Sequence, residues 1–130
     1  MPLFKTTTKH FRIFKKECNK WICEFGLKGW EVVYFHEDDV EDEGRGWASY
    51  KVTGRVCSMG LARTWKGMYP TKRGVRFVAF HEVCELLLAR LMTEAKYRFT
   101  SEEAVDESAH EIIRVLEKVL WEPGIKKRLR

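Results

Sequence analysis

The sequence contains no run of about 18 apolar residues, the length that a membrane-spanning helix needs. We therefore expect no transmembrane helix and no membrane partner. The first residues, MPLFKTTTKHFRIFKK, also lack the apolar centre of a secretory signal. On these two grounds we expect a cytoplasmic protein.

Cysteine is sparse and follows no familiar metal-binding or disulfide pattern. The four cysteines are Cys18, Cys23, Cys57 and Cys84, and no two of them form a C-x-x-C pair. This spacing argues against a zinc ribbon and against a dense disulfide framework, so we expect reduced, mostly buried thiols. The sequence also lacks a phosphate-binding glycine loop and a Ser/His/Asp signature.

What the chain does contain is enough apolar sequence for one folded domain. It has 130 residues, of which 45% are hydrophobic and 33% charged, and we expect a single domain over 1–130. The net charge is +5, with basic residues concentrated near both ends and an acidic run at 37–43. Nucleic-acid contact is one interpretation of the basic ends. No nucleic-acid motif accompanies them, so we favour solvated helix faces.

The first half of the chain reads as a helix followed by three strands. Apolar residues recur at helical spacing over 7–25, and Gly26 is a suitable helix stop. The aromatic and β-branched stretch 30–35 predicts a strand. Residues 47–53 and 56–65 alternate and predict an antiparallel hairpin.

The second half predicts two helices. Residues 73–97 are apolar on nearly every side, which indicates a buried central helix. Thr100 and Glu103 have the spacing of a capping box for a last helix, which Pro123 ends. The fold class is therefore α+β: an N-terminal helix, a three-stranded and mostly antiparallel sheet, a buried helix and a C-terminal helix.

Three ionisable residues interrupt the buried helix. His81 and Glu85 are four residues apart, so they project from one face and could hold one cation between them. Burying such groups is costly unless they are paired or bind a metal. The sequence is H-E-x-x-E, where the zinc-protease pattern has H-E-x-x-H. In that pattern the residue at the place of Glu82 is the general base. Zn²⁺ accepts carboxylate oxygen, and the harder site leaves room for Mn²⁺ or Fe²⁺.

A third ligand should come from the last helix, where His110 and Glu111 compete. His110 shares its stripe with charged residues, which indicates a solvated face. These residues are Glu103, Asp106, Arg114 and Glu117. Glu111 shares its stripe with small and apolar residues, beside what we expect to be the buried line of the helix. That line consists of Val105, Ala109, Ile112, Leu116 and Val119. We therefore choose Glu111 as the third ligand, with His110 as the alternate.

The layout resembles the compact metallopeptidase-like proteins of bacteriophages and prophages, which are similar to SprT-type minimal zincins. The resemblance covers nearly the whole chain up to Glu122. It rests on GLKGWEV at 26–32, WASY at 47–50, ARTW at 62–65, HEVCELLLARL at 81–91 and AHEIIRVLE at 109–117. It implies a zincin-like fold whose active-site helix packs on the sheet.

The resemblance also implies a function. It places a metal on His81, Glu85 and Glu111, makes Glu82 the general base, and implies hydrolysis of peptide bonds by metal-activated water. The partner would be a peptide or protein substrate, and a phage protein would act in the host cytoplasm. Because Glu85 replaces the usual histidine, the alternative is an inactive zincin-like module. Such a module would bind a phage or host protein or a nucleic-acid complex.

Overall fold

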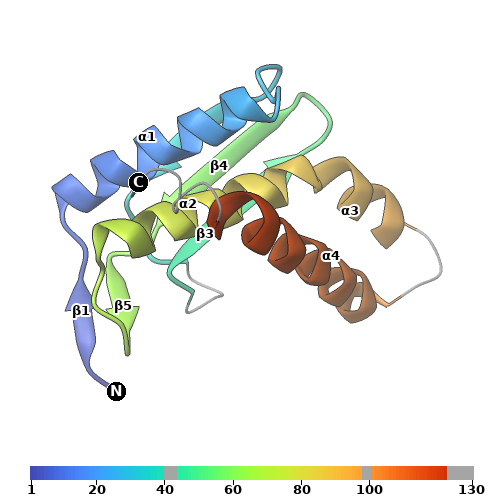
Figure 1. Ribbon diagram of the computed structural model, residues 1–130. Coiled ribbons are helices and arrows are strands. Elements are labelled where there is room, and N and C mark those ends of the chain that lie inside the picture. Colours follow the sequence, from blue (N-terminus) through green and yellow to red (C-terminus); the bar gives the residue numbers. More distant parts are fainter. Residues whose placement is uncertain (40–43, 98–100, 123–130) are drawn as a thin grey trace.

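The computed structural model describes residues 1–39, 44–97 and 101–122, and its mixture of helices and strands is α+β, as predicted (Figure 1). The elements in chain order are β1 (Leu3–Lys5), α1 (Thr8–Glu24), β2 (Glu31–Phe35), β3 (Gly46–Lys51), β4 (Val56–Leu61), β5 (Thr64–Lys66), α2 (Lys72–Leu87), α3 (Ala89–Lys96), α4 (Glu102–Leu116) and the π-helix η1 (Glu117–Trp121). None of the helices in these ranges combines the length and the apolar character that a membrane span needs.

The main sheet has the order β2-β4-β3. The predicted hairpin is confirmed, because β3 pairs antiparallel with β4. β2 pairs parallel with β4, so this sheet has one parallel and one antiparallel pairing and is not mostly antiparallel. β1 and β5 form a separate antiparallel ribbon that the sequence analysis did not anticipate.

The predicted strand 56–65 is divided into β4 and β5. Asp38 explains the break, because its Oδ1 accepts hydrogen bonds from the backbone N–H groups of Arg63 and Thr64 at 2.9 and 3.1 Å. The N–H groups of Arg63 and Thr64 therefore bind the side chain of Asp38 and do not continue the strand pairing of β4. The acidic run that contains Asp38 is described only up to Asp39, and its residues 40–43 lie outside the described ranges.

The first core lies between the sheet and the helices α1 and α2. Buried side chains of β4, such as Met59, meet Phe14 of α1 and Val83 of α2 in one cluster. Figure 1 shows α1 and α2 running side by side. The predicted helix 7–25 is confirmed: Thr7 is its N-cap in a capping box with His10, and Gly26 follows it with a φ of +69°.

A second cluster packs the opposite side of α2 against α4 and η1. It consists of the buried Phe80, Cys84, Ile113 and Trp121. Packing on both sides explains why the sequence of α2 is apolar nearly all round. The predicted single helix 73–97 is wrong in one respect, because it ends at Leu87 and resumes as α3 after Leu88.

The start of α4 also differs from the prediction. Its N-cap is Ser101, whose hydroxyl accepts a hydrogen bond from the backbone N–H of Ala104 at 3.2 Å. Thr100, the predicted N-cap, and Pro123, the predicted stop, both lie outside the described ranges.

Candidate metal centre

Three potential metal ligands meet between α2 and α4. His81 and Glu85 come from α2 and His110 from α4, and each offers one ligand atom within 4.8 Å of the other two. The Nε2 of His81 lies 3.9 Å from the Oε2 of Glu85. The pairing of His81 with Glu85 follows directly from their spacing of four on one helix.

The three residues line an open cleft of about 330 Å³. Its walls are α2, His110 of α4 and residues 44–46 at the start of β3. Gly46 permits this close approach of the strand. A Cβ at Gly46 would overlap the side chain of Val78 and would stand 3.3 Å from the Oε2 of Glu82. The start of a strand therefore lies directly beside the grouped ligands.

Hydrogen bonds orient both imidazole rings. The Nδ1 of His81 lies 3.1 Å from the Oε2 of Glu117, and because a carboxylate only accepts hydrogen bonds, Nδ1 carries the proton and donates a hydrogen bond to Oε2. The Nδ1 of His110 donates to the backbone carbonyl of Asp106 at 2.8 Å. In the neutral form of each ring, Nε2 is then the nitrogen with a lone pair. A hydrogen bond from the other nitrogen to a carboxylate or a carbonyl is the usual support of a metal-binding histidine.

The donor set suits a divalent transition metal. Two imidazole nitrogens and one carboxylate oxygen form a known catalytic zinc set, and the same combination binds Fe²⁺. Ligand atoms that share Zn²⁺ at about 2.1 Å stand about 3.4 Å apart in tetrahedral geometry. The 3.9 Å between His81 and Glu85 is close to this spacing. Glu85 stands where the H-E-x-x-H pattern has its second histidine, and His110 supplies a second imidazole from another helix.

Glu82 lines the same cleft but is not one of the three grouped ligands. It is 4% exposed and lies against the start of β3. A buried carboxylate at the wall of the cleft, one residue after His81, is placed to accept a proton from a reactant held there.

The structure does not bring Glu111 to the site. Glu111 is exposed, and the alternate residue His110 stands beside His81 instead. The cause is the side on which α4 docks. Ile113 is buried against Phe80, whereas Ile112, which we placed on the buried line, is 43% exposed. This rotation turns His110 inward and Glu111 outward.

Glu117 is the residue that the sequence analysis missed. Its side chain is 12% exposed and contacts His81, although we had assigned it to a solvated stripe. One signal was present in the sequence. Glu117 follows His110 by seven residues, which places both on one helix face.

The nearby thiols are not suited to nucleophilic chemistry. Burial, followed by the carboxylates of Glu117, Glu82 and Glu85, raises the pKa of Cys84 to about 12. Burial and the charges of Glu82 and Glu85 likewise raise the pKa of Cys57 to about 12. Both groups remain protonated thiols at neutral pH.

Replacing Glu117 with glutamine should weaken metal binding by about 10- to 100-fold, the range for outer partners of metal-binding histidines. The amide retains the shape of the side chain but loses the charge that favours a proton on the Nδ1 of His81. Competition with a chromogenic chelator measures the affinity. Glu107→Gln, an exposed change on the same helix, is the matched control. Equal affinities in the two variants would contradict this role of Glu117.

Comparisons with known proteins add no relative from which a role could be transferred. The chain matches no protein-family model, no characterised protein and no solved structure. The assignment of a function therefore rests on the geometry of His81, Glu85 and His110.

Proposed function

We propose that this protein is a zincin-like, metal-dependent peptidase. The observation that carries the proposal is the meeting of His81, Glu85 and His110 in an open cleft. Support comes from the hydrogen bonds that orient both rings and from the buried carboxylate of Glu82 in the same cleft. We take Zn²⁺ as the resident ion, with Mn²⁺ or Fe²⁺ as alternatives that the donor set also accommodates.

The residues divide the work of hydrolysis among them. His81, Glu85 and His110 would hold a divalent ion, which when bound would supply Lewis acidity toward a carbonyl and toward water. Glu82 accepts the proton of the attacking water and passes it to the leaving amine. Glu117 holds the ring of His81 so that Nε2 faces Glu85.

An extended peptide is the substrate that the cleft suits. Among the described strands β3 pairs only with β4, so its other edge offers backbone hydrogen-bonding groups. Residues at the start of β3 line the cleft. A peptide added along this edge would run past the grouped ligands, held by main-chain hydrogen bonds. We also propose a cytoplasmic location, which the four free thiols support.

Protein purified without chelator should contain about one metal ion per chain, measured by mass spectrometry of the elements. It should cleave members of a quenched-fluorescence peptide library. A metal chelator should abolish cleavage, and the native ion should restore it. A Glu85→Ala variant is the companion measurement, because the loss of one of three ligands should remove the ion.

Two results would contradict the peptidase. If folded wild-type protein contained no bound metal, the proposed metal centre would be wrong. Protein that binds metal but cleaves no peptide in a broad screen would favour the alternative. In that case the zincin-like scaffold would act as an inactive binding module for a phage or host partner.

A further inference from the structure

A second feature of the surface is a basic groove between α1 and α2. Its volume is about 530 Å³, and it shares no lining residue with the cleft of the candidate metal centre. The residues that line the groove are Ile13, Lys16, Glu17, Lys20, Lys72 and Arg76. The lining thus contains four cationic side chains and one carboxylate, so its net charge is +3.

The cations form two facing pairs. Lys16 and Lys20 are four residues apart on α1, and Lys72 and Arg76 are four residues apart on α2. Side chains at this spacing project from the same face of a helix, with Cβ atoms about 6 Å apart. α1 and α2 run side by side (Figure 1). Each wall of the groove therefore carries two positive charges in a row. Lys16 and Lys72 are exposed.

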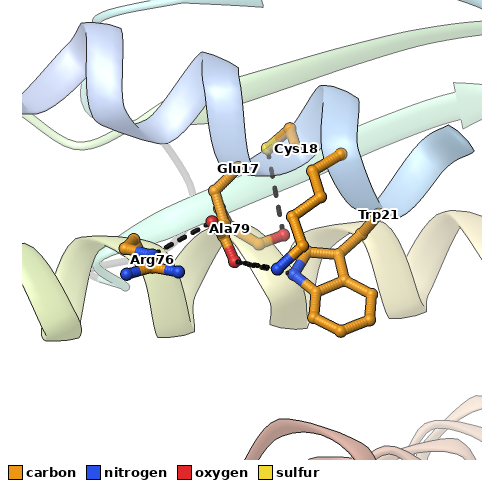
Figure 2. A network of polar contacts seen from close by, with 6 residues as sticks. Glu17, Cys18, Trp21, Arg76 and Ala79 are labelled. Atoms are coloured by element: carbon orange, nitrogen blue, oxygen red, sulfur yellow. Dashed lines mark hydrogen bonds and ion pairs between the residues drawn. The ribbon is translucent and has the colours of Figure 1, made fainter. Parts of the chain in front are cut away.

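Glu17 holds Arg76 and Trp21 in place, and its single negative charge does not cancel the four positive charges of the groove. Figure 2 shows its carboxylate between Arg76 of α2 and Trp21 of α1. Oε1 accepts a hydrogen bond from the Nε of Arg76 at 3.0 Å, and Oε2 accepts one from the indole N–H of Trp21 at 2.8 Å. Among the described residues, the hydrogen bond from Arg76 to Glu17 uses Nε, and the guanidinium carbon lies 5.9 Å from the centre of the Trp121 ring. The two terminal nitrogens can still donate to a ligand.

The ammonium group of Lys20 is held at the groove, and its N–H donors make no hydrogen bond to the described residues. Its Nζ lies 3.9 Å from the Oε2 of Glu17 and 4.6 Å from the centre of the Trp21 ring. This nitrogen is buried and has no hydrogen-bond acceptor among the described residues. An ammonium in that position gains from an anion that supplies acceptor oxygens.

We propose that the groove binds the phosphodiester backbone of a nucleic-acid strand. Phosphate oxygens would accept hydrogen bonds from the two rows of cations. Such rows suit a nucleic-acid strand, because its phosphate groups follow one another along the backbone. Among the described residues, those that line the groove include no aromatic side chain on which a base could stack. Binding is therefore independent of base sequence and strongly dependent on salt. The inference goes beyond the proposed hydrolysis and does not depend on it.

The test measures the binding of a labelled oligothymidylate of about 16 nucleotides, the upper end of a single-domain site. Fluorescence anisotropy is recorded from about 50 to 200 mM salt. For Lys16→Gln/Lys72→Gln we expect the affinity at about 50 mM salt to fall by about tenfold or more. The slope of log K against log salt should flatten by about 1.4, or about 0.7 for each cation removed. Lys28→Gln/Lys51→Gln removes the same charge outside the groove and should change affinity less than about threefold.

Three outcomes would overturn the proposal. Wild-type protein that does not bind the oligonucleotide at low salt excludes a strand site. Equal losses in the two double variants show attraction by net charge alone. Calorimetry in which inorganic pyrophosphate binds as tightly as the strand assigns the groove to a small phosphate ligand. If the double variant did not fold, Lys16→Gln alone would carry the test, with half the change in slope.

Discussion

Glu82→Gln is expected to retain the bound metal and to lower peptide hydrolysis by about 10²- to 10⁴-fold. Glutamine has nearly the same shape as glutamate, and this matters because Glu82 is 4% exposed and packs against the start of β3. An amide cannot take the proton of the attacking water. The loss should therefore appear in the chemical step, while His81, Glu85 and His110 still hold the ion.

The value of kcat/KM for one peptide, together with the metal content of the same preparation, checks this prediction. Glu94→Gln is the matched control, because Glu94 is an exposed carboxylate on α3, paired with Arg90 and outside the cleft. Full activity in Glu82→Gln would exclude the general base. A joint loss of metal and melting temperature would instead make Glu82 a structural carboxylate.

The parts of the site that could be predicted from sequence depend on local geometry. His81 and Glu85 are neighbours because they are four residues apart on one helix, whatever surrounds that helix. The apolar character of α2 likewise indicated burial, and the structure encloses it between the sheet and α4. The hairpin of β3 and β4 could also be predicted from local geometry. The alternation of apolar and polar residues has a period of two within each strand, so it indicates a strand without knowledge of its neighbours.

The sheet topology could not be predicted in this way. The parallel pairing of β2 with β4 joins residues about 25 positions apart, for example Glu31 with Val56. The ribbon of β1 and β5 joins three-residue strands across some 60 positions, such as Phe4 with Trp65. Strands this short carry little local signal, and their pairing depends on how the helices close over the sheet.

The candidate third ligand shows the same limit of sequence-based prediction at the level of one residue. His110 and Glu111 differ by about 100° around α4, so a modest rotation of the helix exchanges them. The sequence analysis placed Ile112 on the buried line, and nothing local indicated that the helix would dock through Ile113 instead. Ile113 docks on the cluster that contains Phe80 and Trp121, and this choice turns His110 toward His81.

The two neighbours on α4 therefore give a sharp test of the metal centre. His110→Ala should weaken metal binding by more than about 100-fold, beyond the range for an outer partner, because it removes a direct ligand. Glu111→Ala should leave affinity within about threefold of wild type, since Glu111 is exposed and is not one of the grouped residues. Chelator competition measures both variants, and circular dichroism confirms the fold.

The comparison separates a ligand from a general electrostatic effect. Glu111→Ala removes an exposed carboxylate next to His110 in sequence, whereas His110→Ala removes an imidazole that is one of the grouped ligands. If the centre merely attracted cations, Glu111→Ala would cause the larger loss, and the loss would shrink as salt is added. A large loss in His110→Ala that persists at high salt is what direct coordination requires. The reverse order would return the third position to Glu111 and would mean that α4 docks in another register.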